Sequence, residues 1–151
     1  MAQIYFDTPT GVFSVTQEGD AIVRAGWNSV QAIESTPLLE EAKAQILAYF
    51  AGELEVFDLA LKVNGSDFQR QVCEVMSAIP FGETRTYGEI AQEIGAPAQA
   101  VGGACGGNPI PLIIPCHRVL SASGLGGFSG TYGVETKVEL LKHEGAASLL
   151  I

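Results

Sequence analysis

Short apolar segments rich in β-branched and aromatic residues predict three strands near the start of the chain. They occupy residues 4–6, 12–15 and 21–27, and the residues between them include glycine, proline and aspartate. Short apolar runs separated by such turn-forming residues are typical of antiparallel neighbours. We therefore expect an antiparallel meander at the N-terminus.

A different periodicity follows over residues 37–50 and predicts a helix. Apolar residues recur three or four positions apart, which places them on one helical face: Leu39, Ala42, Ile46 and Phe50. Pro37 suits the first helical turn, and Gly52 suits the position just past the last one. Residues 56–61 are again mostly apolar and are expected to form another strand.

The Asn-Gly-Ser segment at residues 64–66 has the composition of a linker. Ser66 is also a suitable N-cap for a helix that extends to Ile79. We therefore expect an α/β domain over residues 1–63 and a mostly helical domain over residues 64–151, so the fold class is α/β.

Two further helices are expected in the second domain. Thr86 and Glu89 have the spacing of a capping box, in which each side chain satisfies a backbone donor. This short helix should end near Gly95. The last helix is expected over residues 134–143, with Gly145 as its stop. Its apolar face is formed by Val134, Val138 and Leu141.

Composition narrows the class of protein. The chain has 151 residues, of which 47% are hydrophobic and 17% charged, a composition that excludes intrinsic disorder. No apolar run approaches the ~20 residues that span a bilayer, and residues 1–11 lack the features of a secretory signal. The three cysteines without CxxC spacing argue against a disulfide framework and a zinc ribbon. We expect a cytoplasmic protein without membrane contact.

The charge balance is strongly acidic. Eight Lys and Arg residues against 17 Asp and Glu residues give a net charge of −9. Residues 1–63 carry three basic and nine acidic residues, and residues 64–151 carry five and eight. Nucleic-acid binding usually depends on a basic surface, because neutralised phosphates supply much of the affinity. Overall charge therefore gives no sign of a nucleic-acid footprint.

The strongest chemical signal is Cys116, which stands between Pro115 and His117 at the end of an apolar run. Thiolate is the reactive form of cysteine, and a nearby base or cation can lower the pKa from ~8.5 to roughly 3.5–7.5. In an extended chain, adjacent side chains point to opposite faces. His117 would then reach the sulfur only through a turn or a bridging water. The alternative is a buried, inert cysteine beside a surface histidine.

Glu144 lies at the end of the last predicted helix, where the helix dipole disfavours a carboxylate. Its position is explained if it orients a histidine, since a carboxylate fixes the imidazole tautomer and stabilises the imidazolium. A frayed, solvated helix end is the alternative. Of the other cysteines, Cys73 suits core packing, and Cys105 lies in a glycine-rich segment where small size is the requirement.

The motif around Cys116 resembles that of the O6-alkylguanine-DNA alkyltransferases. The resemblance covers roughly residues 68–145, whereas the first 62 residues match only in size and in the order of strands and helix. The matching segments are AVGGA, GNPIPLIIP, PCHRV, a Gly-Phe-Ser-Gly turn and a helix ending in KHEG. The resemblance implies a ribonuclease H-like first domain and a second domain with a winged helix-turn-helix.

The resemblance also implies roles for individual residues. Cys116 would be the acceptor thiolate that takes an alkyl group from guanine in one irreversible displacement. His117 would be its base, acting through a water, and Glu144 the carboxylate that orients His117. Asn108 resembles the hinge asparagine between the DNA-binding part and the active-site segment. Tyr87 resembles the tyrosine that helps to rotate the nucleotide and protonates the departing guanine at N3.

The implied substrate is alkylated double-stranded DNA with the target base flipped out, because the alkylated oxygen cannot meet a thiolate inside the stack. Ser129 and Gly130 resemble the loop that lines the base pocket, and Pro111 and Arg118 are expected to contact substrate or DNA. The implied protein is a monomeric methylated-DNA–protein-cysteine methyltransferase that acts once and needs no cofactor. Some relatives hold zinc in the first domain, but residues 1–62 contain no Cys or His, so no such metal site is expected.

The chain departs from the family at the recognition helix. Family members usually have an arginine that fills the space left by the flipped base, and this chain has Gln99 there. Between residues 86 and 117 there is no lysine or arginine. We therefore expect weak duplex binding, with base flipping impaired but still possible.

Three alternatives remain open on sequence grounds. The same thiol could act on free alkylguanine or another small alkyl donor, with DNA affinity weakened. An alkyltransferase-like damage sensor shares the fold but lacks the acceptor cysteine, which is present here. A cysteine hydrolase built on Cys116, His117 and Glu144 would turn over on an ester or amide, whereas a transferase stops after one equivalent.

Overall fold

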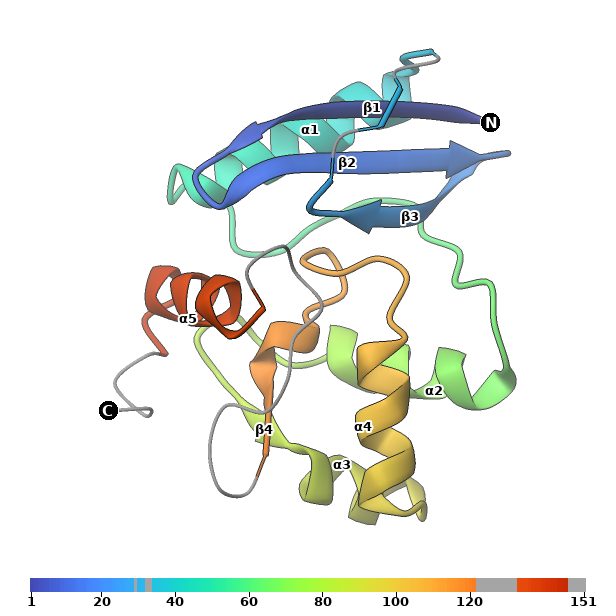
Figure 1. The fold of residues 1–151 in the computed structure, drawn as a ribbon, viewed down its shortest axis with the longest axis vertical. Coiled ribbons are helices and arrows are strands. Elements are labelled where there is room, and N and C mark those ends of the chain that lie inside the picture. The colour runs from blue at the N-terminus through green and yellow to red at the C-terminus, as the bar shows by residue number, and fades with distance from the viewer. Residues whose placement is uncertain (29, 32–33, 122–132, 147–151) are drawn as a thin grey trace.

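The strands at the N-terminus form one antiparallel sheet in the order β1–β2–β3 (Figure 1). The computed structural model describes residues 1–28, 30–31, 34–121 and 133–146. The sheet consists of β1 (Ala2–Thr8), β2 (Gly11–Glu18) and β3 (Ala21–Gly26). Consecutive strands are joined by tight turns, so the expected meander is confirmed.

Helix α1 (Pro37–Phe50) packs against all three strands. The hydroxyl of Thr36 accepts a hydrogen bond from the backbone N–H of Leu39 at 3.1 Å and so caps the helix start. The expected helix is confirmed, but Tyr49 rather than Phe50 completes its fully buried face. The buried residues are Leu39, Ala42, Ile46 and Tyr49.

The strand expected over residues 56–61 is wrong. The segment meets β3 at a single bridge, where the N–H of Ile22 donates to Ala60 O at 2.8 Å and the N–H of Lys62 donates to Ile22 O at 2.9 Å. Phe57 and Leu59 pack against the core. Partial burial therefore explains only part of the apolar pattern, because Val56 is 74% exposed.

The second half is mostly helical, as expected. It contains α2 (Asp67–Ser77), α3 (Tyr87–Ile94) and α4 (Ala98–Gly106), and α4 packs against both other helices. A short parallel pair, β4 (Arg85–Thr86) and β5 (Val119–Leu120), lies beside them. Figure 1 shows the three-stranded sheet and α1 at one end of the molecule and α3 with α4 at the other.

Helices α3 and α4 are joined by a three-residue turn and form the helix-turn-helix. Gly95 ends α3 with φ 70° and ψ 40°, a left-handed conformation that glycine adopts without strain. The expected capping box is present: Thr86 Oγ1 accepts from the N–H of Glu89 at 3.1 Å, and Glu89 Oε1 accepts from the N–H of Thr86 at 2.8 Å.

Helix α5 (Val134–His143) has the expected bounds but presents a different face to the core. Val134 is 44% exposed, so its assignment to the apolar face is wrong. The first turn of the helix is divided, because Val134 and Glu135 are exposed whereas the next two residues are buried. The buried residues are Thr136, Lys137, Leu140 and Leu141.

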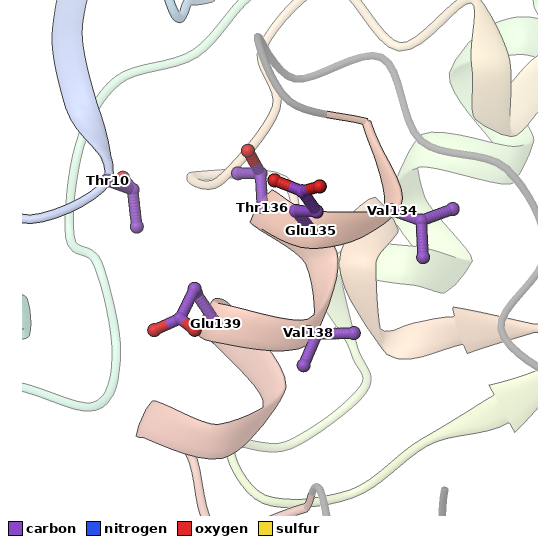
Figure 2. Close-up of a pocket in the computed structure, with 6 residues that line it drawn as sticks. All are labelled: Thr10, Val134, Glu135, Thr136, Val138 and Glu139. Atoms are coloured by element: carbon purple, nitrogen blue, oxygen red, sulfur yellow. The ribbon is translucent and has the colours of Figure 1, made fainter.

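The two halves of the chain share one hydrophobic core and are also joined by hydrogen bonds. The N–H of Ala25 in β3 donates to Pro109 O at 3.0 Å, and His143 Nε2 lies 2.6 Å from Tyr49 O. A cavity of about 450 Å³ lies between the β1–β2 turn and the first turns of α5 (Figure 2). None of the described helices is long and apolar enough to cross a bilayer.

The capping box generates a stability prediction. Thr86→Ala should lower the free energy of unfolding by about 1 kcal/mol, because the N–H of Glu89 loses its acceptor at the start of α3. Urea denaturation followed by circular dichroism measures this change. Thr86→Ser keeps the hydroxyl, so its free energy of unfolding should fall clearly less than that of Thr86→Ala. Equal losses in the two variants would contradict the capping interpretation.

Candidate active site

Residues Cys116–Arg118 form a single 3₁₀ turn after Pro115. The segment is therefore a turn, one of the two arrangements that the sequence analysis left open, and it allows consecutive side chains to point inward. Cys116 is 5% exposed and His117 is fully buried. A buried histidine excludes the alternative of an inert cysteine beside a surface histidine.

Glu144 follows α5 directly, and its side chain is fully buried. Its Oε2 lies 2.7 Å from His117 Nε2 and accepts from Arg118 Nη2 at 3.0 Å, while its Oε1 accepts from Arg118 Nε at 2.8 Å. Burial by itself would raise the pKa of Glu144. The hydrogen bonds from His117 and Arg118 outweigh burial and hold the pKa at about 2. The carboxylate is ionised and fixed, so the helix end is not frayed.

A further donor to Glu144 comes from the first half of the chain. The hydroxyl of Tyr49, in α1, donates to Glu144 Oε2 at 2.6 Å. The sequence analysis did not identify Tyr49 as part of the site. The only sequence signal is a polar aromatic residue at an inward position of α1, one residue before Phe50.

His117 is held in a neutral form with one nitrogen available. Burial lowers the pKa of His117, and the charges of Arg118 and Lys137 lower it further, whereas Glu144 raises it. A neutral imidazole donates through one nitrogen and accepts through the other. With Nε2 on Glu144, the lone pair is on Nδ1, which is buried and has no hydrogen-bond partner among the described residues.

The sulfur of Cys116 is less acidic than the sequence predicts. Burial raises the pKa of Cys116 to about 11, although a hydrogen bond from Asn108 and the charge of Lys137 lower it in part. The resting side chain is therefore a thiol near neutral pH. A base must take its proton when it reacts, which is a function that the neutral His117 can perform.

Asn108 fixes the loop that leads to Cys116. Its Nδ2 donates to Ile114 O at 2.9 Å, and its Oδ1 accepts from the N–H of Ile110 at 3.0 Å. Leu112, inside this loop, has a φ of 74°, a region that non-glycine residues rarely adopt. The contacts of Asn108 therefore hold a backbone that would not persist on its own.

Lys137 is a buried cation that the sequence analysis missed. Its Nζ donates to Val119 O at 2.7 Å, and burial lowers the pKa of Lys137 to about 8, against the opposing influence of Cys116 and Cys105. A positive charge here favours the thiolate of Cys116. The available signal was its spacing, because Lys137 lies four residues before the buried Leu141.

The other predicted site residues occupy varied environments. Tyr87 is the first residue of α3 and half-buried, and burial together with Cys105 and Cys116 raises its pKa. Gln99 is exposed at the second position of α4, and Pro111 is buried. Ser129 and Gly130 lie outside the described residues.

Arg118 does not fit the expected contact with substrate or DNA. Its side chain is buried, with Nη1 donating to Ile79 O at 2.7 Å and the other guanidinium nitrogens on Glu144. An arginine with these partners is a structural counter-ion. Among the described residues, no group of three or more His, Cys, Asp or Glu side chains is arranged to hold a metal ion.

A buried cysteine and histidine beside a helix-turn-helix define a class of DNA-directed proteins that react through a thiol. Two family models match the chain: the ribonuclease-like domain of 6-O-methylguanine DNA methyltransferase over residues 1–63, and the DNA binding domain of the same family over residues 67–146. The chain belongs to the 6-O-methylguanine DNA methyltransferase family.

Individual relatives agree with this assignment. A methylated-DNA–protein-cysteine methyltransferase of Mycolicibacterium paratuberculosis is 50% identical over 124 residues, 80% of this chain and 71% of the relative. The constitutive enzyme of Bacillus subtilis is 40% identical over 91% of this chain and 92% of its own. The structure of Mycobacterium tuberculosis OGT in complex with DNA has a TM-score of 0.83 and 41% identity, covering 96% of this chain and 93% of that one. The resemblance and the α/β fold class are confirmed.

The depressed pKa of Glu144 generates a pH prediction. Glu144→Gln should lower the free energy of unfolding by about 3–5 kcal/mol at pH 7, because Arg118 is left as a buried, uncompensated charge. A carboxyl group whose folded pKa is about 2 stabilises the fold above its unfolded pKa of 4.5, and this contribution is lost as the pH falls toward 2. The difference between variant and parent should therefore shrink across that range in urea denaturation.

Glu139→Gln provides the matched control, since Glu139 is exposed on the same helix. It should change the free energy of unfolding by no more than about 0.5 kcal/mol at any pH. A Glu144→Gln effect that does not depend on pH would contradict the interpretation.

Proposed function

We propose that this protein repairs O6-alkylguanine in DNA by transferring the alkyl group irreversibly to its own Cys116. The relatives are named methylated-DNA–protein-cysteine methyltransferases, and one structural neighbour is a complex with DNA. The observation that carries the proposal is the buried pair of His117, which follows Cys116 directly, and Glu144, which follows α5. It supplies a neutral base and a fixed counter-charge where a protonated thiol needs both.

In the proposed reaction, the proton of the Cys116 thiol passes through a water to Nδ1 of His117. The sulfur attacks the alkyl carbon, so that the S–C bond forms while the bond from carbon to guanine O6 breaks. The electron pair of that bond passes into the guanine, which takes a proton from Tyr87 at N3. Glu144 stabilises the imidazolium. The net result is a thioether on the protein and an unmodified guanine carrying the proton from Tyr87, and Tyr87 is reprotonated through water by the imidazolium of His117, which returns to its neutral form.

Two neighbours support the thiolate during this step. The hydrogen bond from Asn108 and the charge of Lys137 both lower the pKa of Cys116 against the effect of burial. We assign Asn108 the hinge role as well, because its side chain bonds both sides of the loop before Cys116. Pro111, in the same loop, together with Ser129 and Gly130, is proposed to line the pocket for the flipped base.

DNA would be bound through the helix-turn-helix, with α4 as the recognition helix. The exposed Gln99 near the start of α4 would occupy the space of the flipped base. Arg85, just before α3, lies 2.8 Å from Glu93 and is therefore largely neutralised. These features support weak duplex binding, because few phosphates are neutralised. Transfer from free alkylguanine is the less supported alternative, since the relatives act on methylated DNA by name.

We further propose that the protein works as a monomer in the cytoplasm. The large exposed apolar residues of the described chain lie on separate elements and form no evident interface: Met1, Tyr5, Leu47, Val56 and Val134. A reducing compartment suits a protein whose activity needs an unoxidised thiol.

The transfer itself can be tested by intact-protein mass spectrometry. Incubation with a duplex containing O6-methylguanine should add one methyl group per chain, and peptide mapping should locate it on Cys116. Cys116→Ala should show no addition. Addition of one benzyl group from free O6-benzylguanine, with no methyl group added from the duplex, would favour the alternative substrate, and repeated turnover on an ester would indicate a hydrolase.

The role of Gln99 generates a binding prediction. Gln99→Arg should tighten duplex binding and speed repair, because the longer guanidinium side chain fills the space of the flipped base. Its positive charge inside the duplex should also steepen the dependence of log K on log salt by about one. Fluorescence anisotropy at several salt concentrations measures both. Gln31→Arg adds the same charge to an exposed position of the first domain and should have little effect. Equal effects of the two variants would show a general charge effect only.

A further inference from the structure

The carboxylate of Glu144 has one hydrogen-bond donor that the reaction as described does not use. Three of its contacts come from His117 and Arg118, in the 3₁₀ turn that carries the cysteine. The fourth comes from Tyr49 in α1, 95 residues away in the sequence, at 2.6 Å. The first half of the chain therefore contributes a polar group to the hydrogen-bonded network of the active site.

Tyr49 is held too tightly for this contact to be incidental. Its side chain is fully buried, and its ring packs against three other aromatic rings and one imidazole. The centroid distances are 5.0 Å to Phe50, 5.5 Å to Phe57, 6.1 Å to Phe81 and 4.7 Å to His143. The backbone oxygen of Tyr49 also lies 2.6 Å from His143 Nε2. The hydroxyl therefore has a fixed position and direction.

The hydroxyl of Tyr49 can act only as a donor to this carboxylate. Burial and the charge of Glu144 raise the pKa of Tyr49 far above its ordinary value, so the phenol stays protonated. Glu144 is ionised, because its pKa is about 2. Tyr49, His117 and Nη2 of Arg118 all bond the same oxygen, Oε2, so these three donors share the negative charge of that oxygen.

We propose that Tyr49 is a positioning residue for alkyl transfer. Its hydroxyl fixes the Glu144 carboxylate and limits the negative charge that Glu144 directs at His117. His117 therefore stays neutral and able to take the proton of Cys116. This inference rests on the proposed function for its consequence in the reaction. Its structural part, the coupling of Tyr49 to His117 through Glu144, stands on the contacts alone.

The charged and titratable groups around the network are Glu144, its donors His117 and Arg118, Lys137, and His143, whose ring packs against Tyr49 from α5. Glu144 is bonded by Tyr49, which comes from α1, and by His117 and Arg118, which come from the 3₁₀ turn. The pKa of His117 is raised by Glu144 and lowered by Arg118 and by Lys137 from α5. All of these except the hydroxyl are retained in Tyr49→Phe, which also keeps the ring and its packing.

The direction of the effect follows from the shared oxygen. Without the hydroxyl, Oε2 of Glu144 directs more of its charge at the N–H of His117, which favours the imidazolium and raises the pKa of His117. A protonated His117 cannot accept a proton. The acid limb of the pH–rate profile, which reports the protonation of the base, should therefore move to higher pH.

The experiment compares Tyr49→Phe with the parent in single-turnover transfer from an O6-methylguanine duplex. The acid limb should move up by about 0.5–1 pH unit, so that the rate falls about 3–10-fold on that limb and less than about twofold on the alkaline side. A uniform loss at every pH, or no change at all, would overturn the proposal. Phe50→Leu disturbs the same aromatic cluster without touching Glu144, and its acid limb should stay where it is in the parent.

A second measurement does not depend on activity. The chain has only two histidines, so their ring Cε1–H signals can be followed through a pH titration by NMR. The titration of His117 should move to higher pH in Tyr49→Phe and not in Phe50→Leu; an unmoved titration would overturn the coupling. A parent protein that fails to transfer any alkyl group would contradict the proposed function, while this titration would still decide the coupling.

Discussion

The ionised carboxylate of Glu144, buried among four hydrogen bonds, is the interaction on which the rest of the structure depends. An unpaired carboxylate in this position would cost several kcal/mol, roughly the whole stability of many domains. The bonds from Arg118, His117 and Tyr49 reverse that cost and make the ionised form the stable one. Because the donors come from α1 and from the turn at Cys116, folding of both halves is required to complete the site.

This constraint explains why the two halves of the chain pack as one body around the thiol. The N–H of Ala25 on the sheet edge holds Pro109, next to Asn108, so the sheet braces the loop that precedes Cys116. Tyr49 braces the other side through Glu144. The first half of the chain therefore acts on the reactive residues without containing any of them.

Much of the fold and the central part of the site could be predicted from the sequence. Cys116 and His117 are adjacent, and Glu144 is conspicuous as an acidic residue at a helix end, but these local patterns left alternatives open, and the resemblance to the family supplied the predicted roles. Tyr49 and Lys137 were missed because their roles depend on contacts between distant segments. Arg118 was misassigned because a cation in a DNA-binding family is expected at the surface, whereas its counter-ion is Glu144.

The predictions for the strand over residues 56–61 and for the apolar face of α5 were wrong for a related reason. An apolar run does not by itself predict a strand: within residues 56–61, Phe57, Leu59 and Leu61 pack against the core, and the segment pairs with β3 at one bridge only. Val134 was placed inside by spacing, but the deeper positions of α5 are taken by Thr136 and Lys137, whose polar atoms have partners there. A buried polar residue with a distant partner is invisible to hydrophobic periodicity.

Burial of the thiol has a chemical consequence beyond packing. A cysteine whose pKa is about 11 is largely protected from oxidation and from stray electrophiles, because the reactive thiolate is scarce. A protein that can use its cysteine only once benefits from this restraint. The proton should leave only when a substrate occupies the site, and the neutral His117 with its counter-charge on Glu144 is then close enough to accept it. The same burial that makes the resting thiol inert therefore makes the hydrogen-bonded network around Glu144 necessary.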